Sequence, residues 1–287
     1  MMAAPPEAAI VPRLVHRSVV TDPAGAPRDD AIAVEEPLEI RIAGDPVAVT
    51  MRTPGDDGDL ALGFLYGEGI VERAADVGTV AHCGRPGSEG YGNVIDVAPG
   101  AGTSLAWERV EATRRGTLTT AACGVCGRRS IDDLLAACVP LPPGPAIARD
   151  TVLRAIEEMR EAQSLFERTG GTHAAAAYTA GGRRLVGRED VGRHNAVDKV
   201  VGALLKERLV GQGAEPGARG PALLVVSGRA SFEIVQKAIR ARLAAVASVS
   251  APTSLAVDLA GRAGLTLAGF VRGRRINVYA HPARLEG

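Results

Sequence analysis

The sequence has little lysine, few aromatic residues and no excess of either charge. Lys plus Arg and Asp plus Glu number 33 each, and aromatic residues make up 3% of the 287 residues. Because a net charge of zero gives no overall field that attracts nucleic acid or anionic lipid, any anion must be bound by locally placed groups. The only lysines are Lys199, Lys206 and Lys237. Arginine, whose planar guanidinium suits phosphate, supplies the remaining positive charge.

Long apolar runs are also absent. No stretch reaches the roughly 18 apolar residues that a membrane-spanning helix needs. The start, MMAAPPEAAIVPRLVHRS, is interrupted by Pro5 and Pro6 and lacks the apolar core of a signal peptide. We therefore expect a cytoplasmic protein that binds no membrane and no nucleic acid. Four cysteines are too few for a disulfide scaffold, so we expect buried thiols, metal ligands or reactive thiols.

The length and an apolar content of 46% are sufficient for about two domains with hydrophobic cores. Residues 1–30 are rich in proline, alanine and aspartate without periodicity, which predicts a loose arm. Four prolines between Pro140 and Pro145 cannot continue a helix or a central strand, so they predict a domain boundary. We expect an N-terminal domain over 31–145 and a C-terminal domain over 146–287.

The predicted N-terminal domain combines strands with a helix. Alternation of apolar and polar residues around Ala43, Gly44 and Asp45 predicts a hairpin with a short turn. Short strands are expected over 77–81 and 93–97. Asp59 is expected to cap a helix whose apolar residues include Leu60, Leu62, Phe64 and Leu65. This half is therefore predicted to be α+β.

The second half has clearer periodicity. Asp150 is predicted to cap a helix that ends at Gly170 and has one apolar face, formed by Val152, Ile156, Met159 and Phe166. The pair Gly181 and Gly182 predicts a hairpin, and a helix is expected from about His194 to Leu209. Strands and helices then alternate, which predicts an α/β layer around a largely buried sheet.

Cys123 and Cys126 form a C-x-x-C motif with glycines at 124 and 127, which predicts a short loop where the two sulfur atoms can approach each other. Ser130 and Asp133 resemble a capping pair, so the thiols should lie just before a helix N-terminus that favours the thiolate. Neighbouring arginines favour it further: Arg114, Arg115, Arg128 and Arg129.

An isolated C-x-x-C is also typical of structural zinc sites and of redox dithiols. Zinc needs two further ligands, and the sequence has no second C-x-x-C and no H-x3-H. The remaining candidates are His82, Cys83 and Cys138. Because Cys138 falls on the apolar side of a predicted helix, a buried inert thiol is the favoured interpretation, and we expect no bound metal.

The α-β-β-α order that opens the second half suggests a deaminase-like layer, but the ligands of zinc deaminases are missing. His173 is followed by two alanines, and Ala122 stands where the deaminase P-C-x-x-C motif has proline. A deaminase-like shape without deaminase chemistry is compatible with these residues, because a fold does not determine a function.

Two loops follow buried strands and precede helices, a position where α/β layers bind anions. One contains Ser227, Gly228 and Arg229, and the other spans 250–254 with Ser250 and Thr253. Ordinary helix caps are the alternative interpretation. The sequence contains neither G-x-G-x-x-G nor G-K-[ST].

Two further segments concentrate charge. Residues 188–199, which include His194, lie at a strand-to-helix junction, where a solvated charged turn is the simpler interpretation. A basic turn between the last two strands could clamp a pyrophosphate, with a plain hairpin tip as the alternative. It consists of Phe270, Val271, Arg272, Gly273, Arg274 and Arg275.

Four blocks occur in order: CGVCGRRS, GREDVGRHNAVDKVVG, SGRASFEIVQKA and SAPTSLAVDLA. From about residue 30 to the end, the chain closely resembles the FdhD family of formate dehydrogenase accessory sulfurtransferases. The resemblance implies a cytoplasmic homodimer with a cytidine-deaminase-like C-terminal domain. Such proteins accept sulfur from a cysteine desulfurase and pass it to the molybdenum of bis-molybdopterin guanine dinucleotide, which formate dehydrogenase needs in its sulfurated form. GDP is expected to act as an analogue of this cofactor.

The resemblance also implies roles for individual residues. The family's persulfide cysteine matches Cys123 and its second cysteine matches Cys126, which assists or resolves the persulfide. The cofactor-binding segment falls on residues 270–275 by its place in the last strand pair. The loops and the charged junction are expected to add further cofactor contacts: Ser227, Arg229, Ser250, Thr253 and His194.

A persulfide relay needs an exposed thiolate on a loop that can reach both donor and acceptor, which agrees with the C-x-x-C motif. Two other functions remain open on the residues alone. A zinc-stabilised structural protein would hold stoichiometric metal, and a dithiol oxidoreductase would form a reversible disulfide between Cys123 and Cys126. The expected fold class is α/β (α+β), with the C-x-x-C loop in the smaller N-terminal domain.

Overall fold

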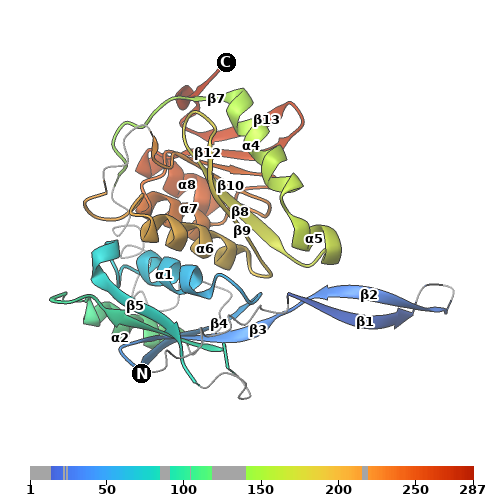
Figure 1. Ribbon diagram of the computed structural model, residues 1–287. Helices are drawn as coiled ribbons and strands as arrows, with labels where there is room; N and C mark the ends of the chain where they lie inside the picture. The colour runs from blue at the N-terminus through green and yellow to red at the C-terminus, as the bar shows by residue number, and fades with distance from the viewer. Residues whose placement is uncertain are drawn as a thin grey trace, which may run out of the picture.

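The computed structural model describes residues 14–21, 23, 25–84, 91–103, 105–117, 140–214 and 219–287, with side chains described throughout these ranges except at 115–117. Their strands form a six-stranded sheet, a four-stranded sheet and two separate strand pairs. The six-stranded sheet and its helices make up one part of the molecule, the smaller sheet lies beside it, and a long hairpin projects from the side (Figure 1). This mixture of helices and sheets confirms the predicted α/β class in its broad form.

The second half of the chain forms the six-stranded sheet, in the order β13-β12-β11-β10-β8-β9. Strands β10, β11 and β12 are parallel, and the other neighbours are antiparallel. The hairpin predicted at Gly181 and Gly182 is confirmed as β8–β9. The strand bounds are β8 His173–Tyr178, β9 Arg184–Asp190, β10 Leu223–Val226, β11 Ala245–Ser248, β12 Thr266–Arg272 and β13 Arg275–Ala280.

Helices cover both faces of this sheet, so the predicted α/β layer is confirmed. On β8, Ala175 and Ala177 join an apolar cluster with α6, α7 and α8, whereas Ala174, Ala176 and Tyr178 join a second cluster with α4. The alternation follows from the two-residue period of a strand. The helix bounds are α4 Arg149–Glu161, α5 Ser164–Thr169, α6 Arg193–Lys206, α7 Phe232–Arg240 and α8 Ser254–Ala263. Short strands β7 (Ile147–Ala148) and β14 (Leu285–Glu286) pair beside this layer, and η3 (Pro282–Arg284) precedes β14.

The single helix predicted from Asp150 to Gly170 is wrong in two respects. Ala148, and not Asp150, is the N-cap residue of α4. The helix also stops at Glu161, and α5 starts at Ser164, because the Glu189 carboxylate accepts hydrogen bonds from backbone N–H groups at the start of α5. Phe166 lies on this second helix and is 46% exposed instead of buried. Gly170 ends α5 in the left-handed conformation, as predicted for the end of this segment.

The four-stranded sheet lies in the first half, in the order β4-β3-β6-β5. Its strands confirm the predicted hairpin at Ala43 and Gly44 and both predicted short strands. The bounds are β3 Glu36–Ile42, β4 Asp45–Arg52, β5 Val77–His82, β6 Val94–Pro99, α1 Asp57–Gly67, η1 Ala74–Asp76 and α2 Trp107–Thr117. The predicted cap was wrong, because Asp56 is the N-cap residue of α1 and Asp59 is buried in ion pairs with Arg188 and Lys206.

The expected loose arm over residues 1–30 is wrong for its second part. Strands β1 (Val15–Thr21) and β2 (Pro27–Ala33) form an antiparallel hairpin that extends away from both sheets (Figure 1). Residues 1–13 lie outside the described part of the chain. Aspartates at 29 and 30, which suggested a loop, tolerate a strand here because both faces of the hairpin are largely exposed.

Helices α1 and α6 cross at two glycines. A Cβ at Gly63 would lie 1.9 Å from the carbonyl oxygen of Asp198, and one at Gly202 would lie 1.8 Å from that of Asp59. The backbones can touch only because neither residue has a side chain. Buried apolar residues of both halves accordingly form one cluster. The division into domains at residue 145 stays a prediction.

Candidate functional site

The predicted catalytic cysteines, Cys123 and Cys126, lie outside the described residues, as does Cys138. Of the arginines expected near the thiols, Arg114 forms ion pairs with Glu111 and Asp45. Its charge is therefore already partly neutralised within α2 and β4. The sulfur chemistry predicted for this segment stays a prediction.

The basic turn predicted at 270–275 joins β12 to β13 and borders a groove of about 820 Å³. The groove is lined by Val249, Phe270, Arg272, Arg274, Arg275 and Asn277. The structure thus brings four of the six predicted segment residues to one concave surface. Val271 is buried in the core beneath it, and Gly273 adopts a left-handed turn conformation.

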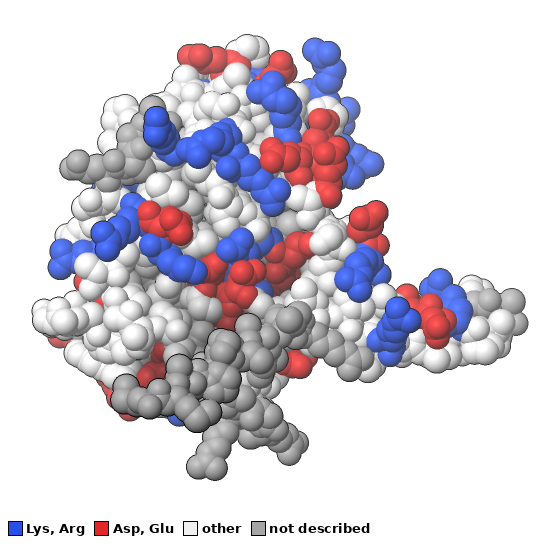
Figure 2. Space-filling model, in the orientation of Figure 1, with Lys and Arg blue, Asp and Glu red and all other residues white. Residues whose placement is uncertain are grey.

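The three arginines of this groove are exposed, and none of their side chains has an ion-pair or hydrogen-bond partner among the described residues. Elsewhere, on the face shown in Figure 2, basic and acidic side chains are interspersed. Three unpaired guanidinium groups around one groove therefore create a local positive field in a chain of zero net charge. Guanidinium groups bind phosphate through paired charge-assisted hydrogen bonds, so this groove suits a phosphate-bearing ligand.

Phe270 has a positive φ of 52°, which is rare for an aromatic residue. The pairing of β12 with β13 is irregular between Gly269 and Arg272, and the Phe270 N–H donates to the Ser250 carbonyl at 3.0 Å. This bond holds the irregular segment so that the Phe270 ring, 44% exposed, reaches the surface of the groove. An exposed ring there offers a flat apolar face for stacking. The backbone of Ser250 thus contacts this segment directly.

The two predicted loops are joined to each other. Thr253 donates its N–H to the Ala230 carbonyl at 3.0 Å, and Ala230 and Pro252 form a parallel β-bridge. Ser227 uses its hydroxyl to accept the Ala174 N–H at 2.9 Å, so it is a structural contact within the sheet. Helix α7 begins five residues beyond Ser227, at Phe232, with Ser231 as its N-cap residue. The side chain of Arg229 is exposed and has no partner among the described residues.

His194 lies at the start of α6 and bridges to α7. Its Nε2 lies 3.0 Å from Ser231 Oγ, and its Nδ1 lies 3.2 Å from a Glu233 carboxylate oxygen. With Glu233 as acceptor, Nδ1 carries the proton and Nε2 accepts the Ser231 hydroxyl. Burial lowers the pKa of His194 to about 4 against the opposing effect of Glu233. The imidazole is therefore neutral at neutral pH, and both of its nitrogens are occupied by protein groups.

Buried charges continue this network. Lys237 Nζ lies 3.4 Å from Glu233 and 2.7 Å from Asp198, and Lys199 pairs with Asp190 at 2.8 Å. The solvated charged turn that we considered for residues 188–199 is therefore wrong, because Asp190, Asp198 and Lys199 are each at most 3% exposed. Charges at this depth are stable only as pairs, and residue type alone could not indicate the partners on α7 and in the loop after β4.

Sequence reasoning missed several residues of the basic groove and of the network around His194. Asn277 follows Arg275 by two positions on β13, so strand alternation could have placed it beside that arginine on the groove. Val249 carries no such signal. Ser231 and Glu233 lie at the start of a predicted helix, but only the packing of α6 against α7 makes them partners of His194. Arg193 Nε is buried nearby and has no hydrogen-bond partner among the described residues.

In the described part of the chain, no three His, Cys, Asp or Glu side chains lie close enough together to hold a metal ion. The described residues therefore offer no candidate zinc site. Cys83 is a free, half-buried thiol, and His82 Nε2 lies 3.4 Å from Asp57. Among the described helices, none combines the length and the apolar character that crossing a membrane requires.

Comparisons with known proteins converge on one family. The model of the FdhD/NarQ family matches residues 33–286. The sulfur carrier protein FdhD of one Anaeromyxobacter dehalogenans strain is 57% identical over 283 residues, covering 99% of this chain and 96% of the relative. That of Mycobacterium tuberculosis is 47% identical over 267 residues, covering 90% and 92%. A crystal structure from Desulfotalea psychrophila, provisionally assigned as a formate dehydrogenase accessory protein, superposes with a TM-score of 0.70 at 26% identity, covering 95% of this chain and 98% of the other.

Proposed function

The chain belongs to the FdhD/NarQ family, and we propose that it is a sulfur carrier that serves the maturation of formate dehydrogenase. The names of its relatives support the carrier role, and the protein of similar structure supports the link to formate dehydrogenase. The strongest support for the proposal is the family match over residues 33–286. The matched range includes the C-x-x-C motif of Cys123 and Cys126.

In the proposed reaction, the Cys123 thiolate attacks the outer sulfur of a persulfide on a cysteine desulfurase. A new S–S bond forms on Cys123 and the desulfurase leaves as a thiolate, so one sulfur atom moves and no external oxidant is needed. The terminal sulfur then passes to the molybdenum of the substrate cofactor and becomes a sulfido ligand. The two electrons for this reduction come from the substrate metal, and Cys123 leaves as a thiolate. Cys126 assists this release or resolves the persulfide.

The basic groove supports bis-molybdopterin guanine dinucleotide as the substrate that receives the sulfur. The side chains of Arg272, Arg274 and Arg275 have no partners among the described residues and can bind the phosphates, while Phe270 offers a stacking surface. GDP carries the same diphosphate and serves as a probe. Arg229 is a further exposed arginine whose side chain has no partner among the described residues, and we keep it as a peripheral contact.

The same membership supports two finer proposals. Residues 146–287 form a cytidine-deaminase-like layer, in agreement with an antiparallel pair, β8–β9, followed by the parallel strands β10, β11 and β12. The working protein is a homodimer, which size-exclusion chromatography with light scattering can test. The desulfurase and formate dehydrogenase are its protein partners.

The deciding experiment is intact-mass measurement after incubation with a cysteine desulfurase and cysteine. The wild-type chain should gain one sulfur atom that reducing agent removes, and Cys123→Ala should gain none and fail to activate formate dehydrogenase. Cys138→Ala is the matched control and should behave as wild type. Full activation by Cys123→Ala would refute the carrier role of this residue. Stoichiometric zinc that Cys138→Ala loses would instead establish the structural zinc alternative.

A further inference from the structure

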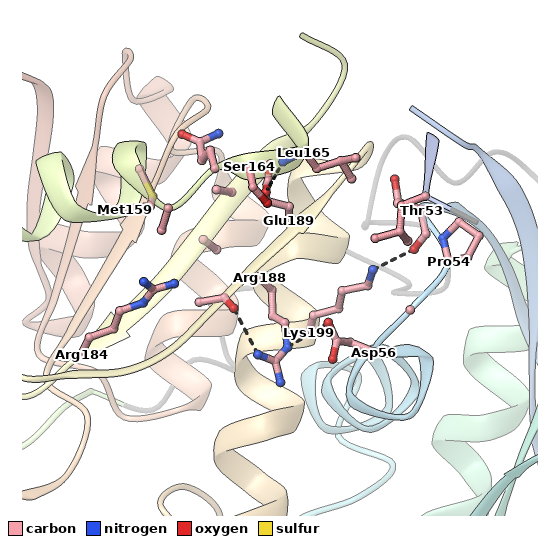
Figure 3. A pocket seen from close by; sticks show the side chains of 17 residues that line it. Thr53, Pro54, Asp56, Met159, Ser164, Leu165, Arg184, Arg188, Glu189 and Lys199 are labelled. Carbon is pink, nitrogen blue, oxygen red and sulfur yellow. Dashed lines mark hydrogen bonds and ion pairs between the residues drawn. The ribbon is translucent and has the colours of Figure 1, made fainter. Parts of the chain in front are cut away.

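A second cavity, of about 410 Å³, lies where the two halves of the chain meet (Figure 3). It is bordered by residues 53–56 between β4 and α1, by the junction of α4 and α5, and by the edge strand β9. Met159 and Leu165 contribute apolar surface. It shares no lining residue with the basic groove, so it is a separate site.

Most charged groups of this cavity are already satisfied by the protein. The Glu189 carboxylate accepts three hydrogen bonds, from the Leu165 and Phe166 N–H groups and from the Thr172 hydroxyl. Lys199 donates to the Thr53 carbonyl at 2.8 Å while paired with Asp190. These contacts fix the wall of the cavity, so a ligand would find it preorganised.

Arg188 is also largely engaged. It pairs with Asp56 at 3.3 Å and with Asp59 at 2.7 Å, and it donates to the Gly187 carbonyl. Figure 3 shows its guanidinium directed toward Asp56 and away from Glu189. Its charge is therefore committed to the contact between β9 and the start of α1.

Several polar groups of the lining have no hydrogen-bond partner among the described residues, including Arg188 Nε, and two of them are the end groups of Arg184 and Gln163. The Arg184 guanidinium forms no ion pair and no side-chain hydrogen bond. Gln163 is only 6% exposed, yet its side-chain amide forms no hydrogen bond. Because its amide atoms are not fully enclosed by protein atoms, they can take hydrogen bonds from water or from a ligand. Both groups lie in the cavity wall, so one ligand can satisfy both.

The strand geometry explains how Arg184 reaches the cavity. Arg184, Gly187 and Glu189 pair with Tyr178, Ala176 and Ala174, which all face α4, because the pairing shifts register between Ala177 and Tyr178. The shift moves Arg184 to the same face of β9 as Glu189. A Cβ at Gly187 would lie 2.1 Å from a terminal nitrogen of Arg184. The guanidinium thus lies directly over Gly187, where only glycine leaves room for it.

We propose that this cavity binds a small organic monocarboxylate, with its carboxylate on Arg184 and a second polar group on the Gln163 amide. One unpaired cation matches one negative charge. The Glu189 and Asp56 carboxylates in the lining repel a second negative charge, which disfavours a phosphate dianion. Apolar surface from Met159 and Leu165 fits a carbon skeleton between the two polar ends. This inference does not depend on the sulfur-carrier role.

Isothermal titration of the full chain with pyruvate, L-lactate, L-glutamine and inorganic phosphate tests the site. Pyruvate and L-lactate each carry one further hydrogen-bonding group, and L-glutamine carries two, its ammonium and its amide. At least one should bind more tightly than phosphate and raise the thermal unfolding midpoint. Arg184→Gln should weaken that binding about tenfold or more, and Gln163→Leu should weaken it several-fold. Gly187→Ala should weaken it as well, because the guanidinium must move although its charge is kept.

Arg183→Gln is the matched control, since Arg183 precedes Arg184, is exposed as Arg184 is, and lies outside the cavity lining. It should bind the carboxylate as the wild type does, and all variants should unfold at similar temperatures without ligand. The proposal is overturned if none of the three carboxylates binds, if phosphate binds more tightly than all of them, or if Arg183→Gln and Arg184→Gln lose affinity equally.

Discussion

Lys237 Nζ donates to both carboxylate oxygens of Asp198, at 2.7 and 3.0 Å, and thereby joins α7 to α6 through two buried side chains. Asp198 and the nearby Glu233 raise the pKa of Lys237 even though burial opposes this, so the ammonium stays charged. One cation thus pairs with two carboxylates. The Glu233 carboxylate in turn orients His194.

Removing this cation should therefore be more harmful than removing its nearer partner. Lys237→Met leaves Asp198 and Glu233 without a counter-charge, and we expect a loss of about 3 to 5 kcal/mol of unfolding free energy. Asp198→Asn keeps an acceptor for Lys237, which still pairs with Glu233, so about 1 to 2 kcal/mol is expected. Urea unfolding of the two variants measures both values. A larger loss in Asp198→Asn than in Lys237→Met would contradict this account of the pair.

The neutral state of His194 predicts a specific loss of stability in acid. Burial lowers its pKa from 6.5 to about 4 in the folded chain, so the unfolded chain takes up a proton first as the pH falls. The stabilisation is complete above pH 6.5 and is lost progressively toward pH 4. At the acid end of this window the loss should be roughly 2 to 3 kcal/mol.

Urea unfolding at several pH values, with His194→Gln as the reference, isolates this effect, because glutamine does not titrate and can still bond to Ser231. The wild type should lose more stability than the variant across the window. Parallel pH curves for the two proteins would show that His194 does not carry the proton uptake.

Alanine substitutions at Gly202 and Gly261 should change the stability in opposite directions, because Gly202 lies in the close crossing of α1 and α6 and Gly261 lies in open space on α8. Gly202→Ala places a Cβ 1.8 Å from the Asp59 carbonyl oxygen, a backbone atom that cannot move alone, so the helices must separate. We expect a loss of about 3 kcal/mol or more, as for severe overpacking. Gly261→Ala on α8 meets nothing within 4 Å and should instead stabilise the chain by about 0.5 to 1 kcal/mol. Thermal unfolding of both variants checks the sign, and a stable Gly202→Ala would refute the crossing geometry.

Local patterns predicted the elements that local forces determine. The turns at Ala43 and Gly44 and at Gly181 and Gly182, and the alternation of strands and helices after α6, follow from turn chemistry and periodicity. The break between α4 and α5 could not be predicted in this way, because it depends on Glu189, which comes from a strand more than twenty residues further along the chain.

The same distinction applies to the candidate site. The basic turn was visible as three arginines between two strands, and the groove beside it confirms that four of its residues share a surface. Asp59 and Asp150 illustrate the opposite case. Each stands where a cap is expected, but Asp59 is drawn into ion pairs with Arg188 and Lys206, and α4 begins one residue before Asp150. For Asp59, tertiary charge pairing outweighs a capping bond of about 1 kcal/mol.

The basic groove gives the prediction closest to the proposed function. Arg274 is exposed at the tip of the β12–β13 turn and has no protein partner among the described residues, so its guanidinium is available to a diphosphate. Arg274→Ala should cost about 2 kcal/mol of binding free energy, or about thirty-fold in the affinity for GDP. Arg154→Ala is the matched control, because Arg154 is an exposed arginine on α4 that donates to Thr151 and lies outside the groove. Calorimetric titration of both variants with GDP should separate them. Equal affinities would remove the turn from the nucleotide site and leave the sulfur-transfer half of the proposed function to be judged on Cys123 alone.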